Sequence, residues 1–463
     1  MKNLFKTVVI ALSLGALVTG CKKDDENGTD PGTNKPTPAV WTDPEIIGNI
    51  SANTSLVDTI KYELKGYVYV KAGATLTIPA GTIIKGDNFT KGTLIVEQGA
   101  KIIAEGTSAR PIVFTSSLPV GQRNYGDWGG IIILGKAPQN QPGSPIIEGG
   151  VDRHFGGTDA ADNSGILKYV RIEFGGIALS PNNEINGLTL GAVGSGTVIE
   201  NVQISYSGDD AFEWFGGTVN AKNLIAHRTW DDDFDTDNGF VGKVQFAVAL
   251  RDRAIADQST SNGFESDNDA TSTNNGPQTG AVFSNVSVFG HFATISDTTG
   301  ASTLIGRGMH IRRNSAQSVF NTVITGYREG IRLDNNDISG NNTQSNMTAG
   351  RLVLKNVTLA GNVKALNASG GANLADFTTA FNSAANNNQI VANIADLKLN
   401  ANNFSLTNPN FLPQAGSPLL NSGDFSDAKL STYFDKSATF RGAFGTTDWT
   451  SGWANFNPQT TVY

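Results

Sequence analysis

Two stretches of acidic residues are the part of this sequence best suited to chemistry. They occupy residues 209–213 and 231–235, and an apolar strand headed by asparagine precedes each of them, at Asn201 and Asn223. Both landmarks move by 22 residues from the first copy to the second. A fixed period in the twenties is typical of a solenoid, in which each turn buries its apolar face against its neighbours. Carboxylates repeated at this period are therefore expected to stack from turn to turn.

The units are strand-like, with short runs of alternating apolar and polar residues bounded by Gly, Asn and Asp. Because side chains alternate across a strand, one column of this repeat faces inward: Phe212, Phe234, Phe264, Met309 and Ile331. The neighbouring positions then face outward as a second column: Glu213, Asp235, Glu265, His310 and Arg332. Two positions further on, a third column also faces outward: Phe215, Asp237, Asp267, Arg312 and Asp334. Successive turns are about 4.8 Å apart, so we predict one ionisable wall, acidic at one end and basic further along.

So many carboxylates at this spacing repel one another, and either a cation lies among them or some are protonated at neutral pH. Hard oxygen ligands at this density favour Ca²⁺ over zinc or copper. The predicted metal-binding residues are Asp209, Asp210, Asp231, Asp233, Asp235, Asp237 and Asp267. The alternative is a solvated acidic edge in which Asp residues cap turns.

The same wall could serve catalysis or ligand binding. A glycoside hydrolase needs two carboxyl groups that flank the scissile bond, and a lyase needs a basic residue to abstract a proton. Candidate catalytic residues are Asp209, Asp210, Asp232, His310, Arg312 and Arg332. Candidate ligand-binding residues are Glu213, Asp235, Glu265, His310, Arg312, Arg332 and Trp230.

Other features extend the repeat along the chain. The unit at Phe264 follows that at Phe234 by 30 residues, and the one at Met309 comes 45 residues later, which we interpret as two turns. Asparagine recurs at one position of the turn and predicts a ladder of amide hydrogen bonds: Asn201, Asn223, Asn285, Asn321 and Asn356. The 53 glycines suit tight turns, and few regular helices are expected.

The pattern of the first residues predicts a targeting signal rather than a folded element. Two lysines precede an apolar run over residues 8–17 that is too short to span a bilayer. The run ends in residues 18–21, which resemble a bacterial lipobox and imply a signal peptide over 1–20 and lipid attachment to Cys21, the single cysteine. The charged residues 22–26 resemble the tag that sends lipoproteins of Bacteroidota to the outer face of the outer membrane. Residues 21–40 are then a flexible linker.

From residue 66 onward, the chain consists largely of short strand-like segments separated by glycine. Residues 73–84, 92–96 and 99–107 carry them, and residues 128–133, 167–174 and 411–423 continue the pattern. These segments resemble those of right-handed parallel β-helices of the pectin-lyase-like class. The resemblance implies an all-β fold, a single right-handed parallel β-helix solenoid with turns of about 22 residues. We predict an entry segment or cap over 41–66, the β-helix over 67–425 and a C-terminal cap over 426–463.

Together these features predict an outer-membrane surface lipoprotein that binds an extended ligand, a polysaccharide, along the ionisable wall with calcium. One alternative is a calcium-dependent polysaccharide lyase or glycoside hydrolase. Another is a non-catalytic adhesin or a subunit of an outer-membrane protein complex. The lipoprotein resemblance suggests an outer-membrane transporter as partner, whereas a formal net charge of −8 argues against nucleic acid.

Overall fold

A computed structural model describes residues 37–180, 183–294, 296–335 and 342–463, and Pro38–Tyr463 form one compact unit. The predicted signal peptide, Cys21 and the linker up to residue 36 lie outside the described residues. Within the described ranges, no helix has the length and apolar character needed to cross a membrane.

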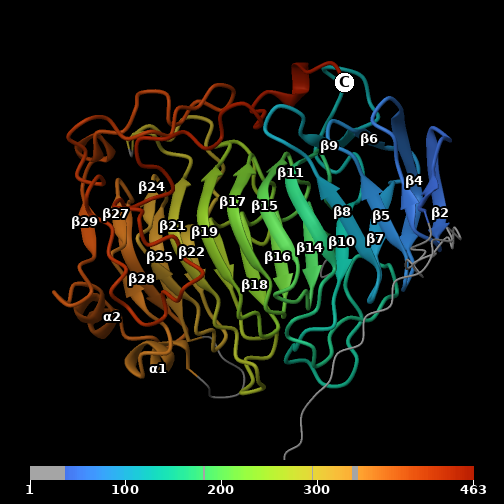
Figure 1. Cartoon of the computed structure of the whole chain (residues 1–463). Helices are drawn as coiled ribbons and strands as arrows, with labels where there is room; N and C mark the ends of the chain where they lie inside the picture. The colour runs from blue at the N-terminus through green and yellow to red at the C-terminus, as the bar shows by residue number, and fades with distance from the viewer. Residues whose placement is uncertain (1–36, 181–182, 295, 336–341) are drawn as a thin grey trace, which may run out of the picture. The chain divides into compact units, whose positions relative to one another are not determined.

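The compact unit is a parallel β-helix, as predicted, and its strands stack in three columns (Figure 1). The first column contains β1 (Ala39–Val40), β3 (Thr54–Ser55), β5 (Thr75–Ile78), β8 (Lys101–Glu105), β23 (Ser318–Phe320) and β26 (Leu354–Lys355). The second contains β6 (Ile83–Gly86), β9 (Ile112–Ser116), β24 (Val323–Thr325), β27 (Thr358–Ala360) and β29 (Gln389–Val391). The third contains β7 (Thr93–Val96), β10 (Gly130–Leu134), β14 (Leu188–Gly191), β16 (Phe212–Phe215), β18 (Phe234–Asp237), β20 (Phe264–Ser266), β22 (Arg307–Ile311), β25 (Glu329–Asp334) and β28 (Lys364–Ser369).

Longer strands bend from one column into the next. Those that join the first and second columns are β11 (Gly165–Glu173), β15 (Val198–Ser205), β17 (Asn220–His227), β19 (Lys243–Leu250) and β21 (Val282–Phe289). β2 (Glu45–Ile50) and β4 (Lys61–Val70) join the second and third columns. One antiparallel hairpin, β12 (Ile177–Ser180) and β13 (Asn183–Ile185), projects from this framework.

The predicted asparagines lie at the bend between the first and second columns. Each has a positive φ, from 48° at Asn321 to 60° at Asn356. Asparagine tolerates this left-handed conformation better than most residues, which explains its recurrence. Direct amide bonding from turn to turn is confirmed at Asn356, which donates to Asn321 Oδ1 (2.6 Å) and accepts from Asn387 (2.9 Å).

The predicted inward column is confirmed. Phe212, Phe234 and Phe264 are adjacent in register and fully buried, and their ring centroids lie 5.9 and 5.4 Å apart. The outward column is confirmed as well, because Glu213, Asp235, Glu265, His310 and Arg332 pair in that order. Apolar stacking inside the solenoid therefore fixes the register of the ionisable residues outside it.

One predicted spacing is wrong. Glu265 pairs directly with His310, so the 45-residue interval is a single turn that carries long loops rather than two turns. The predicted boundaries also need correction at the N-terminal side. Residues 41–66 contain β2, β3 and the start of β4, which are already paired in the solenoid, because their alternating side chains bury the same core.

The C-terminal end is closed by a helix instead of the aromatic tail. Two short helices, α1 (Thr343–Thr348) and α2 (Leu374–Phe381), follow the last long loops. α2 buries Phe377 and Phe381 against the main core. Residues 426–463, for which a cap was predicted, bond the side of the solenoid. Two 3₁₀ turns, Ile394–Leu397 and Pro458–Thr460, complete the helical content among the described residues.

Residues 420–463 run along the side of the solenoid, and we call them the C-terminal strap (red in Figure 1). Amide side chains from every second turn of this part of the solenoid hold it. Gln203 bonds both the backbone N–H and C=O of Asn455, and Gln245 does the same with Asp435. Asn321 bonds Asp424 in the same two-way manner. These three amides therefore attach the strap at three separate points.

Candidate acidic site

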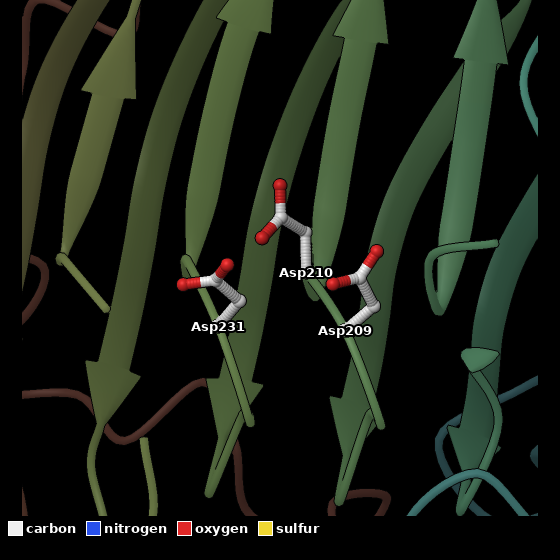
Figure 2. Close-up of side chains that lie close together, drawn as sticks. All are labelled: Asp209, Asp210 and Asp231. Carbon is white, nitrogen blue, oxygen red and sulfur yellow. The ribbon is translucent and has the colours of Figure 1, made fainter. Parts of the chain in front are cut away.

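The turns that lead into β16 and β18 bring carboxylates together beside the N-terminal ends of these third-column strands. Asp209, Asp210 and Asp231 lie close together on these two neighbouring turns (Figure 2). Their arrangement follows from the repeat, because Phe212 pairs with Phe234 and carries the preceding acidic pairs into register. The hydrogen bond from the backbone N–H of Asp232 to Asp210 Oδ1 (2.7 Å) ties the two turns.

A cavity of about 620 Å³ opens here, and acidic groups dominate its wall. The residues that line it are Glu148, Glu184, Asp209, Asp210, Glu213, Asp231, Asp232, Asp235, Asp257, Gln258, Ser259, Thr260, Glu265 and Arg312. We call this cavity the acidic cavity. It gathers seven of the predicted carboxylates and adds three from insertions between the turns.

Three sets of carboxylates within the cavity have oxygen atoms that all lie within 4.8 Å of one another. The sets are Asp209, Asp210 and Asp231; Asp210, Glu213 and Asp235; and Asp232, Asp235 and Glu265. Calcium binds oxygens at about 2.3–2.6 Å, so two ligands on opposite sides of one ion are about 4.8 Å apart. The sets share Asp210 and Asp235, and the acidic residues form one continuous group.

Several oxygens in this group have no partner within the described residues. Asp231 accepts a hydrogen bond from Ser259 Oγ at Oδ2 (2.8 Å), but its buried Oδ1 has none. The buried Oδ1 of Asp235 also lacks a donor. Asp209 is only 8% exposed and directs its carboxyl group into the cavity. Buried acceptors without donors are costly unless a proton or a cation satisfies them.

Burial and mutual repulsion raise the pKa values of these carboxyl groups. Burial, reinforced by Asp232 and Asp209, raises the pKa of Asp210 well above its usual range. The pKa of Asp231 rises to about 7, chiefly because the group is buried. Burial also raises the pKa of Glu148 to about 7. At neutral pH without a cation, the cavity therefore retains protons.

Glu265 differs from its neighbours. Burial alone would raise its pKa, but the Arg312 guanidinium and His310 outweigh burial and lower the pKa to about 2. Arg312 contacts Glu265 through Nη2 and Asp267 through Nε (2.8 Å). His310 Nδ1 lies 3.5 Å from Glu265, and its Nε2 lies 3.4 Å from Asp334. An ionised carboxylate thus borders a group of protonated ones.

Some predicted site residues lie elsewhere. Asp233 precedes β18 and is fully buried in an ion pair with Arg251 (3.0 Å), and it belongs to none of the three carboxylate sets. Asp267 forms ion pairs with Arg312 (2.8 Å) and Arg313 (2.6 Å). Asp237 lies at the far end of β18 and lines a smaller hollow of about 240 Å³ beside Phe215. These three correct the predicted set, because strand alternation places Asp237 but cannot identify charge partners from other turns.

Two predicted ligand-binding residues are engaged with other groups. Arg332 forms a two-pronged ion pair with Glu329 (2.6 and 2.7 Å). Trp230 packs edge-on against Tyr125, with ring centroids 5.4 Å apart, and is not among the residues that line the acidic cavity. His310 and Arg332 continue the wall beyond the cavity, as their register shows.

Three acidic residues of the cavity were missed. Glu148 comes from the loop over 137–165, Glu184 from β13 and Asp257 from the loop between β19 and β20. These insertions follow no repeat, so the period could not place them. The one available signal was length, because the 30-residue interval between Phe234 and Phe264 requires an extra loop beside the acidic turns.

Comparison with known proteins agrees with this architecture. A family model described as a pectate-lyase-like β-helix domain matches residues 48–454, and the chain belongs to this family. A solved structure of the pectate lyase Pel9A is similar over 86% of this chain and 88% of that one, at 15% identity and a TM-score of 0.36. The comparison with curated proteins gives no match. Membership of the family suggests a carbohydrate-related function.

Proposed function

We propose that this protein binds an acidic polysaccharide along the third column, with calcium held in the acidic cavity. The observation that supports the proposal is the continuous group of carboxylates around Asp210 and Asp235, some of whose buried oxygens lack a donor among the described residues. These residues fit calcium because they supply hard oxygen ligands at compatible spacing. Calcium bound here would neutralise the cavity and attract carboxylate groups of the polymer.

The shape of the fold favours an extended ligand. Outward side chains repeat along the third column from Glu213 through Glu265 to Arg332, which gives successive units of a polymer successive contacts. His310 and Arg332 extend this surface beyond the cavity on its basic side. A small metabolite would use only one part of such a surface.

The test is calorimetric titration of residues 38–463 with CaCl₂ at pH 8, with Asp210→Asn and Asp396→Asn as variants. Asp396 is exposed and remote in sequence from the acidic turns, which makes it a matched control. We expect a Kd on the order of 10⁻⁶–10⁻⁵ M for the unmodified chain and for Asp396→Asn, and at least about tenfold weaker binding for Asp210→Asn. Hexagalacturonate should then bind only with calcium present. Absence of heat with CaCl₂ would contradict the proposal.

One observation favours catalysis as a second candidate function. Glu265 has a pKa of about 2, whereas burial and the charges of Asp231 and Glu265 raise the pKa of Asp232 well above its usual range. Their oxygens lie within 4.8 Å of each other. Glycoside hydrolysis uses one ionised and one protonated carboxyl group, separated by about 5–5.5 Å in retaining enzymes. Sugar release that is lost in both Glu265→Gln and Asp232→Asn would establish a hydrolase.

The lyase alternative has less support from the geometry. Arg312 is the one basic residue among the described residues that line the acidic cavity. Burial would lower its pKa, but Glu265 and Asp267 raise it well above the usual range. A guanidinium held in this way is a poor proton acceptor. Unsaturated products from a polyuronate would nevertheless decide for a lyase.

The location is a separate part of the proposal. We propose that lipid on Cys21 holds the protein on the outer face of the outer membrane, with the following polar residues as a tether. An outer-membrane transporter that takes up the bound polymer is the proposed partner. Co-purification of such a transporter from membranes would support this partnership.

A further inference from the structure

A second hollow lies between the C-terminal strap and the bend of the solenoid. Its volume is about 520 Å³, within the range of small-molecule sites, about 300–1,000 Å³. One side comes from β17 and β19, and the other from three parts of the strap. It shares no lining residue with the acidic cavity. We call it the strap groove.

Three partly buried aromatic residues line the strap groove: Phe246, Phe440 and Trp449. Phe246 and Phe440 contact each other, with ring centroids 6.2 Å apart. Trp449 stacks on the buried Phe444 at 5.0 Å and an interplanar angle of 1°, and its indole N–H donates to Ala443 O (2.9 Å). The indole is therefore fixed in orientation, with its polar atom satisfied, where Trp449 lines the groove.

Phe246 occupies an unusual backbone position. It lies at the left-handed bend where neighbouring turns carry Asn223 and Asn285, and its φ is 60°. A bulky residue is disfavoured in this conformation, whereas asparagine is accommodated there. Strain of this kind is retained at functional sites more often than elsewhere. Tyr169 takes the same bend on β11, with φ 49°, and packs on Trp453 of the strap, so an aromatic residue at this bend places its ring against the strap, and at Phe246 the ring also lines the groove.

The rim of the groove is polar, and its two charged residues each have a contact within the protein. Hydroxyl and amide side chains surround the aromatic residues: Asn223, Asn421, Ser437, Thr439, Thr446 and Thr447. Lys222 Nζ lies 4.7 Å from the ring centroid of Tyr433, and Asp435 accepts hydrogen bonds from Ser437 N and Oγ (3.0 and 2.6 Å). A ligand with an apolar face and hydroxyl groups at its edge matches this combination.

We propose that the strap groove binds a neutral sugar unit, as a carbohydrate site separate from the acidic cavity. The C–H face of the pyranose ring would lie on Phe246 and Trp449, and its hydroxyl groups would bond the rim. A neutral sugar is favoured over a uronate because Lys222, the one cation among the described residues that line the groove, already lies over the Tyr433 ring and interacts with Asp435, whose pKa it helps to lower. This inference does not depend on calcium in the acidic cavity.

The test uses the full protein and four neutral probes: cellohexaose, mannohexaose, xylohexaose and maltohexaose, each titrated by calorimetry with calcium and with EDTA. We expect at least one probe to bind with a Kd of about 1 mM or tighter, with or without calcium. Phe246→Asn removes the ring but suits the left-handed bend, so its melting temperature should stay the same or rise while the affinity falls about tenfold.

Two further variants separate the outcomes. Asp210→Asn disables the acidic cavity and should leave neutral-probe binding unchanged. Thr446→Val exchanges an exposed rim hydroxyl for a methyl group and should weaken binding less than Phe246→Asn does. The proposal is overturned if no probe binds at about 10 mM, if Phe246→Asn keeps full affinity, or if EDTA or Asp210→Asn abolishes binding.

Discussion

Asp210 is the residue on which the acidic cavity depends most directly. It belongs to two of the three carboxylate sets, and its Oδ1 holds the backbone of Asp232. The protons that such groups retain stabilise the calcium-free protein, because they neutralise buried carboxylates. Calcium and protons therefore compete for the same oxygens, and calcium affinity should rise with pH as those protons leave.

The pKa values predict how stability changes with pH. A carboxyl group whose pKa is raised in the folded state binds its proton more tightly there, so stability falls as pH rises from the unfolded pKa to the folded one. For Asp231 and Glu148 the interval runs from ordinary values of 3.8 and 4.5 to about 7. The calcium-free protein should therefore have a higher melting temperature at pH 5 than at pH 8. Glu265 acts in the opposite direction, but only below its ordinary value of 4.5.

Differential scanning fluorimetry across pH 4.5–8.5 with EDTA measures this dependence. Saturating calcium should raise the melting temperature most at pH 8, where the carboxylates have lost their protons. Asp396→Asn serves as the control, because its exposed group should not change the slope. A melting temperature that increases from pH 5 to pH 8 in EDTA would be inconsistent with the raised pKa values.

Arg251 positions the acidic turns from beneath. Its guanidinium pairs with Asp233 and donates to the backbone oxygens of Asn262 (2.9 Å) and Asp231. Arg251→Met leaves the Asp233 carboxylate buried without its partner, which should cost about 3–5 kcal/mol in urea unfolding. The double variant Arg251→Met with Asp233→Leu removes the unpaired charge and should recover part of that loss. Its calcium affinity should remain low, since the backbone of Asp231 is still unsupported; full recovery of affinity would refute a positioning role.

At the scale of elements, the sequence predicted those positions that the repeat determines. Period and alternation placed the inward column of Phe212, Phe234 and Phe264 and the outward column beside it, because both follow directly from strand geometry. Insertions have no such rule. Glu148 and Asp257 reach the cavity from loops, and the partners of Asp233 and Asp267 come from other turns. Contacts of this kind depend on the three-dimensional course of the chain.

The strap illustrates the same limit. A cap was predicted over residues 426–463, but α2 packs on the core near the C-terminal end and the strap lies along the side. The reason lies in Gln203, Gln245 and Asn321, whose side chains each bond both a backbone donor and a backbone acceptor of the strap. Amides placed singly on different turns give no recognisable motif in one sequence.

Loss of one of these amides should loosen the strap. Gln245→Ala removes the donor to Asp435 O (3.1 Å) and the acceptor for Asp435 N (2.7 Å), at a cost of about 1–3 kcal/mol. We expect faster cleavage of residues 420–463 in limited proteolysis and a lower urea midpoint. Gln122→Ala, whose side chain is exposed, is the control and should match the unmodified protein. Equal cleavage rates in Gln245→Ala and Gln122→Ala would rule out this attachment.

At the scale of the whole molecule, we propose an acidic domain that is attached to a membrane and binds a polymer. The chain carries a net charge of −8 and would repel an acidic polysaccharide without a bridging cation. The compact unit begins at Pro38, so a lipid on Cys21 would leave a polar segment between the membrane and the binding surface.

Cys21 provides the test at this scale. One buried acyl chain contributes about 0.8 kcal/mol per methylene, and two or more chains make membrane attachment stable. Cys21→Ala should therefore move the protein from the membrane pellet to the soluble fraction after cell lysis. Its calcium titration and melting temperature should not change, because Cys21 precedes the compact unit. Surface digestion of intact cells by an added protease should remove the unmodified protein if it faces outward. A variant that still sediments with membranes would show attachment by another route, and it would remove the lipid anchor from the proposal while leaving the acidic cavity and the strap groove as they stand.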